Sequence, residues 1–74
     1  MILYLITEEN HGEIAITETF GKAIDFLYSD EWIIESDLNR GAADNMTLEE
    51  FNDYFDDMIR ITKIKFEKGV ARLR

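Results

Sequence analysis

The segment Ile2–Thr7 constrains the fold most, because it is apolar on both of the faces that an extended strand presents. Leu3 and Leu5 would point to one face, and Ile2, Tyr4 and Ile6 would point to the other. A strand with one face in water would instead alternate apolar and polar residues. The segment therefore predicts a strand that is central in its sheet or lies at an interface.

Local signals predict a hairpin and a helix after this segment. Polar residues 8–12 lead into a short alternating stretch in which Ile14 and Ile16 are expected to share one face, as is typical of a β-hairpin. Thr19 can cap the helix that follows. The apolar residues of that helix recur at three- and four-residue spacing and form one stripe: Phe20, Ala23, Ile24 and Leu27.

A second helix is predicted after Thr47, which forms a capping box with Glu50, while Met46 and Phe51 form the accompanying hydrophobic staple. On a helical wheel, one face of this helix is apolar. That face is expected to contain Leu48, Phe51, Tyr54, Phe55, Met58 and Ile59.

The end of the chain predicts a second hairpin, with strands at Ile61–Phe66 and Val70–Leu73 and a loop of residues 67–69 in which Gly69 can take a positive φ. Residues 38–46 are expected to form a loop, and residues 30–37 either a short strand or a packed connection. We therefore predict a single α+β domain over residues 1–74. It is an antiparallel sheet of about four strands with two helices packed on one face, in the order ββα-loop-αββ.

The residues that catalysis or metal binding requires are scarce. The chain has no Cys, and its one histidine, His11, falls in a predicted turn, so neither a nucleophile with a base nor a thiolate metal site is expected. A segment from Asp37 begins like a calcium loop but places Gly41 and Leu48 where that motif needs oxygen ligands. We expect a protein that is not an enzyme and has no metal and no cofactor. The N-terminal apolar run is too short for a signal or a membrane span, which favours the cytoplasm.

Charge is distributed unevenly along the chain. Residues 1–59 contain 15 acids and two bases, a net charge of −13, whereas residues 60–74 carry +5. Nucleic acids and anionic membranes bind proteins mainly through Lys and Arg, so neither is expected to bind the acidic part directly. The favoured partner is a basic protein or, as the alternative, a neutral one.

Acids concentrate on the second helix and in the segment that precedes it. Residues 48–59 contain no Lys or Arg, so the acids there have no opposite charge one turn away along the helix. Such a surface is either solvated only, or it imitates the phosphates of a nucleic-acid strand, since acids one turn apart recur every 5 to 6 Å or so. The candidate partner-binding residues are Asp30, Glu31, Glu35, Asp37, Glu49, Glu50, Asp53, Asp56 and Asp57.

The chain is small, strongly acidic and of mixed α+β character, and its acids are concentrated in the stretch TLEEFNDYFDD at residues 47–57 and in residues 30–37. The chain resembles the small acidic inhibitor proteins of the anti-CRISPR type that phages and prophages encode. The resemblance implies a protein that occupies the nucleic-acid-binding surface of a host defence or replication protein, for example a CRISPR effector nuclease.

The sequence leaves two functions open. The first is an acidic nucleic-acid mimic that inhibits a basic, nucleic-acid-binding protein. The second is a small homodimeric accessory module whose acids only keep it soluble, with Leu3, Leu5 and Phe26 as candidate dimer contacts. Salt should weaken binding in the first case and leave self-association intact in the second.

Overall fold

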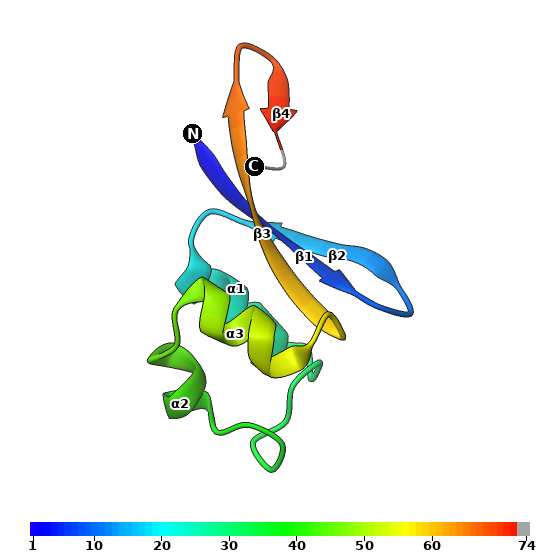
Figure 1. The fold of residues 1–74 in the computed structure, drawn as a ribbon, viewed down its shortest axis with the longest axis vertical. Coiled ribbons are helices and arrows are strands. Elements are labelled where there is room, and N and C mark those ends of the chain that lie inside the picture. Colours follow the sequence, from blue (N-terminus) through cyan, green and yellow to red (C-terminus); the bar gives the residue numbers. More distant parts are fainter. Residues whose placement is uncertain (73–74) are drawn as a thin grey trace.

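A computed structural model describes residues 1–72 as a four-stranded antiparallel sheet with three helices on one side (Figure 1). Strand β1 (Ile2–Glu8) lies between β2 (Gly12–Thr17) and β3 (Ile59–Glu67). Strand β4 (Val70–Arg72) pairs with the C-terminal end of β3 on its other edge. The strand order is β2-β1-β3-β4. The predicted α+β class and antiparallel sheet are confirmed, and the strand that is apolar on both faces is central.

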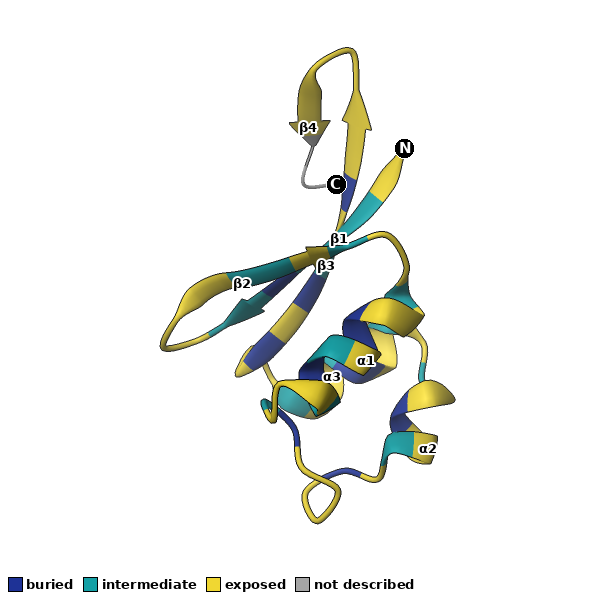
Figure 2. Ribbon diagram, turned by 180° about the vertical axis from the view of Figure 1, so that it is seen from behind, coloured by how far each residue is buried: buried dark blue, intermediate teal, exposed yellow. Residues whose placement is uncertain are grey.

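The core lies between the sheet and helices α1 (Phe20–Ser29) and α3 (Leu48–Phe55). Figure 2 shows the buried residues gathered where these helices face the strands. Alternate residues of β1 and β3 point into this space, because the register pairs Ile6 with Ile61. The most completely buried large side chains are Ile6, Ile24, Leu27, Phe51 and Ile61.

Both predicted helix caps are confirmed. The Thr19 hydroxyl accepts a hydrogen bond from the backbone N–H of Lys22 at 3.0 Å. At α3 the capping box is complete: the N–H of Glu50 donates to the Thr47 hydroxyl at 3.1 Å, and the N–H of Thr47 donates to the Glu50 carboxylate at 2.8 Å. These bonds satisfy backbone donors that the helix itself leaves free, so they define where each helix begins.

Replacing Thr47 with alanine should therefore lower the free energy of unfolding by about 1 kcal/mol. Urea unfolding followed by circular dichroism measures the change. The matched control is Asp53→Asn, an exposed residue of the same helix that lies beyond its first turn and takes no part in the capping box, and its unfolding midpoint should stay near the wild-type value. An unchanged midpoint for Thr47→Ala would show that the cap contributes nothing to stability.

Helix α3 is shorter than predicted and ends at Phe55. Asp56 and Asp57 both have positive φ, 49° and 69°, and reverse the chain so that Ile59 can enter β3 on the core side. Asp is one of the few residues that tolerate this conformation. The helical wheel was therefore wrong for the residues after the helix: Met58 is 54% exposed, and Ile59 is buried but belongs to a strand. Within α3, Tyr54 was also placed on the core face and is 51% exposed.

The connection between α1 and α3 also differs from the prediction. Within residues 38–46, predicted as a loop, Arg40–Asp44 form a short helix, α2, so three helices are present where two were expected. Residues 30–37 are not a strand but a packed connection, in which the N–H groups of Trp32 and Ile33 both donate to the carbonyl of Leu27. The buried side chain of Ile33 holds this connection against the core.

A β-bulge overturns the expectation that Ile14 and Ile16 share one face. The register between β1 and β2 shifts next to Ile6, which pairs with Ala15, while Thr7 pairs with Glu13. The extra residue, Ile14, packs against the core from the helical side. Ile16 pairs with Leu5 and so lies on the opposite face of the sheet.

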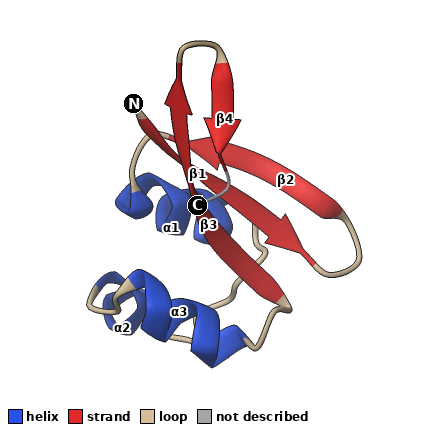
Figure 3. Cartoon of the chain, turned by 45° about the horizontal axis from the view of Figure 1, so that its top comes forward, coloured by secondary structure: helices blue, strands red, loops and turns tan. Residues whose placement is uncertain are grey.

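The second hairpin projects beyond the helices (Figure 3). Its strands reach Glu67 on one side and begin at Val70 on the other, so the loop has two residues rather than the predicted three. Lys68 and Gly69 both have positive φ, 52° and 77°, as the most common two-residue hairpin turn requires. Leu73, predicted as the last strand residue, lies outside the described residues.

Candidate partner-binding surface

All nine predicted partner-binding acids are exposed. They lie on three neighbouring segments: α3, the turn at its C-terminal end, and the connection from α1 to α2. We call this set the acidic surface; its residues are Asp30, Glu31, Glu35, Asp37, Glu49, Glu50, Asp53, Asp56 and Asp57. The hydroxyl of Tyr54 on α3 donates to the carbonyl of Asp37 at 2.9 Å, which holds the connection beside the helix.

The helical part of the acidic surface is Glu49, Glu50 and Asp53. Glu49 and Asp53 are four residues apart and therefore lie one turn apart on the same side of α3. Glu50 already takes part in the capping box, and both glutamates lie in the first turn, where the helix dipole favours negative charge. The row of acids one turn apart is consequently shorter than the sequence predicted, with Asp53 as its last helical member.

The acids after α3 belong to a turn instead of a helix face. Asp57 accepts a hydrogen bond from the guanidinium of Arg60 at 2.9 Å, so one of these acids does have a cationic partner three residues away. Both members of this pair are exposed, which limits its contribution to less than about 1 kcal/mol. The expectation that acids of this stretch have no opposite charge one turn away was therefore wrong for Asp57.

Two acids of the connection have local structural roles. The Asp30 carboxylate accepts a hydrogen bond from the indole N–H of Trp32 at 3.0 Å. The Glu35 carboxylate accepts from the side-chain amide of Asn39 at 3.2 Å and from the backbone N–H of Arg40 at 3.1 Å, at the start of α2. Within residues 1–72 the structure gives no side-chain partner to Glu31, Asp37, Glu49, Asp53 or Asp56.

Arg40 and Tyr28 link the acidic connection to α1. Arg40 forms an ion pair with Asp25 of α1, and its guanidinium lies 5.8 Å from the centre of the Tyr28 ring. The Tyr28 hydroxyl donates to the carbonyl of Leu38 at 2.6 Å. Burial raises the pKa of Tyr28, and the negative charges of Glu35 and Asp44 raise it further, so the phenol stays protonated as a donor.

The three candidate dimer contacts are not brought together. Leu3 and Leu5 lie on the face of the sheet away from the helices, because they alternate along β1 with Ile6, which is buried on the helical side. Phe26 is half-buried on α1 and packs against the core on the helical side, so it does not share a surface with Leu3 and Leu5. Ile16 of β2 and Ile64 and Phe66 of β3 lie on the same face as Leu3 and Leu5, and none of the three was among the predicted dimer contacts.

No group of three or more His, Cys, Asp or Glu side chains among residues 1–72 is arranged to hold a metal ion. In the same part of the chain, no helix has both the length and the apolar character needed to cross a membrane. Comparison of the chain with protein-family models, with curated proteins and with solved structures found no match. What the protein does must therefore be inferred from its residues and their geometry.

Proposed function

We propose that the protein is a non-enzymatic, cytoplasmic inhibitor that binds a basic protein through the acidic surface and occupies the place of nucleic acid there. The observation that supports this proposal is the exposure of all nine acids on adjoining segments of a chain whose residues 1–59 carry a net charge of −13. A cationic nucleic-acid-binding cleft attracts such a surface over long distances and speeds the encounter.

The spacing of the acids supports the same proposal. Glu49 and Asp53 are separated by one helical turn, about 5 to 6 Å, which is of the order of the distance between neighbouring phosphates on one strand. Asp37 is held beside α3 by the Tyr54 hydroxyl, so the acids extend past the helix on a second segment. In this proposal Glu50, Asp57, Asp30 and Glu35 shape the surface, since their carboxylates already have local partners.

The proposal is tested with two variants of equal net charge. The first, Glu49→Gln with Asp53→Asn and Asp56→Asn, removes three acids of the acidic surface that have no described partner. The second, Glu13→Gln with Glu18→Gln and Glu67→Gln, removes three exposed acids on β2, just after β2 and at the end of β3, away from the segments of the acidic surface. Each variant and the wild type serve as bait in bacterial lysate at low and high salt, and a captured basic protein is then tested for displacement of single-stranded DNA.

We expect the wild type and the second variant to capture the same nucleic-acid-binding protein at low salt and to displace DNA from it. The first variant should bind it at least tenfold more weakly, and high salt should weaken all three complexes. Both variants should melt close to the wild-type temperature, because every replaced side chain is exposed. Equal loss of binding in both variants would mean that overall negative charge, not the acidic surface, determines binding, and no capture by the wild type would mean that the acids only keep the protein soluble.

A further inference from the structure

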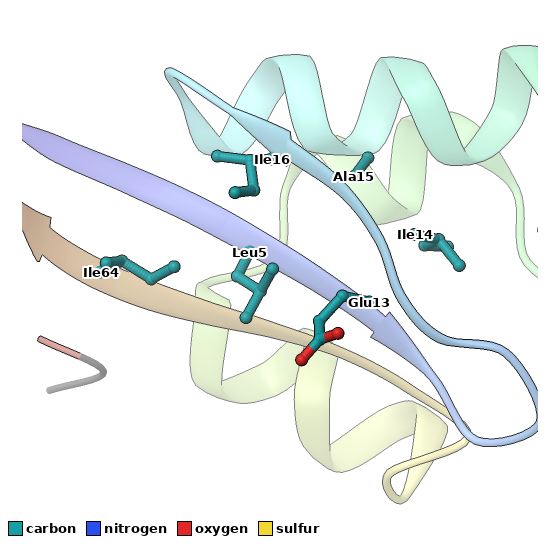
Figure 4. Close-up of a pocket in the computed structure, with 6 residues that line it drawn as sticks. All are labelled: Leu5, Glu13, Ile14, Ala15, Ile16 and Ile64. Atoms are coloured by element: carbon teal, nitrogen blue, oxygen red, sulfur yellow. The ribbon is translucent and has the colours of Figure 1, made fainter. Parts of the chain in front are cut away.

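The face of the sheet opposite the helices has an apolar centre, which we call the open sheet face. Its residues follow from the register: Leu5 pairs with Ile16 on β2 and with Thr62 on β3, and Leu3 pairs with Ile64. Ile16 is 58% exposed, and Phe66, further along β3, is 43% exposed. Figure 4 shows Leu5, Ile16 and Ile64 around a shallow hollow of about 610 Å³, with the helices on the other side of the strands.

Charge on the open sheet face is confined to one row at its end. Across the three strands this row reads Glu13, Thr7 and Arg60, because Thr7 pairs with both of the others. The Glu13 side chain points to the same hollow as Leu5. The row thus carries Glu13 on one side of the central strand and Arg60 on the other. The guanidinium of Arg60 also donates to Asp57 of its own chain at 2.9 Å, and its side chain stays half exposed. A strongly basic or strongly acidic partner would find no matching charge here.

A second copy of the same face does match it. Neighbouring strands lie about 4.8 Å apart, so Glu13 and Arg60 are on the order of 10 Å apart with Thr7 midway between them. A two-fold axis along β1, in the plane between two such faces, exchanges the two sides of the row. It places Glu13 of each copy over Arg60 of the other, Leu5 over Leu5 and Leu3 over Leu3. Two sheets packed in this way stack about 10 Å apart.

The position of the acidic surface is compatible with this arrangement. Helices α1 and α3 cover the sheet face opposite to Leu5, so the acids of α3 and its flanking segments lie on the outer sides of such a pair. The two negatively charged halves are therefore kept apart, and added salt screens the repulsion that remains between them. The contact itself is mainly apolar and depends little on salt.

We propose that the open sheet face binds a second copy of this chain in a two-fold symmetric dimer, with Glu13 and Arg60 exchanged between the copies. The central contacts are Leu3, Leu5 and Ile16, whereas Ile64 is 5% exposed and already packed within its own chain. Because each copy presents the same patch, the interface closes on itself and forms no longer assemblies. This proposal does not depend on the acidic surface. Apart from Asp57, which pairs with Arg60 at the end of the open sheet face, the acids lie on the other side of the sheet and remain free.

Sedimentation velocity over a concentration series tests the dimer, with circular dichroism melts to verify that each variant folds. Ile16→Glu places an unpaired charge in the contact and should weaken the dimer on the order of 100-fold. The matched control is Ile34→Glu, the same change at a residue that is 48% exposed on the α1 to α2 connection, and it should leave the dimer unchanged. The dimer should persist at high salt.

Charge reversal tests the symmetry of the contact. Glu13→Arg alone brings two arginines together and Arg60→Glu alone brings two acids together, so each should weaken the dimer by about tenfold. The double variant Glu13→Arg with Arg60→Glu restores opposite charges across the two-fold axis and should recover most of the affinity. A monomer at millimolar concentration, an Ile16→Glu variant that dimerises like the wild type, or a double variant weaker than both single variants would each overturn the proposal.

Discussion

Replacing Phe51 with alanine should leave the domain largely unfolded at room temperature. Phe51 is 0% exposed and is the largest fully buried side chain among the described residues. Its ring contacts Phe20 of α1 edge-on, with 6.0 Å between ring centres, and Phe55 with 4.8 Å between ring centres. Truncating such a side chain costs about 3–5 kcal/mol, and a core of this size supplies roughly the same amount in total.

The measurement is the amide proton dispersion in an NMR spectrum, together with far-ultraviolet circular dichroism. Phe66→Ala is the matched control, because it removes the same side chain from the exposed part of β3, and at dilute concentration it should cost less than about 1 kcal/mol. A Phe51→Ala protein that melts cooperatively within about 1 kcal/mol of the wild type would show that the core does not depend on this ring.

The second large effect is expected at Asn52, which joins α3 to the outer edge of β3. Its side-chain amide donates to the carbonyl of Ile61 at 2.9 Å, and its side-chain oxygen accepts from the N–H of the same residue at 2.9 Å. The N–H and carbonyl groups of Ile61 point away from β1, so the Asn52 side chain takes the place that another strand would occupy. The pair of bonds lets β3 continue past α3 with its outer edge satisfied.

Asn52→Ala leaves both backbone groups of Ile61 without a partner at a half-buried site, which should cost about 2–3 kcal/mol. Urea unfolding measures that loss, and amide hydrogen exchange should show much faster exchange at Ile61. Asn10→Ala in the first hairpin turn is the control, where an exposed amide is lost and the change should stay within about 0.5 kcal/mol. If Asn52→Ala were as stable as the control, the bridge would have no energetic role.

Short-range patterns were sufficient to predict most of the elements. Thr19 and Thr47 marked the helix starts correctly, because a capping bond joins groups two or three residues apart and needs no distant contact. The apolar strand at Ile2–Glu8 was correctly expected to be central. The exposure of the candidate acids was also foreseeable, since carboxylates without partners remain in water.

Long-range contacts explain the errors. Continuing α3 to residue 59 satisfied the helical wheel, but the chain has to reverse at Asp56 so that Ile59 and Ile61 can face the core from β3. Helix α2 is short and has little intrinsic stability; the Asn39 cap, the Glu35 carboxylate and the ion pair from Asp25 hold it in place. Of these contacts only the Asn39 cap is local, and one cap residue does not by itself predict a helix of five residues; the ion pair from Asp25 comes from α1 and has no signature in the local sequence.

The β-bulge decided the second surface of the molecule. Alternation alone placed Ile14 and Ile16 on one face, and the inserted residue separates them, sending Ile14 to the core and Ile16 to the open sheet face. Local sequence thus determined which segments are strands and helices, where the helices begin and how charge divides between the body and the last hairpin. The tertiary structure alone decided which side chains from different segments share a face. This depends on the register and packing between segments that are far apart in the chain.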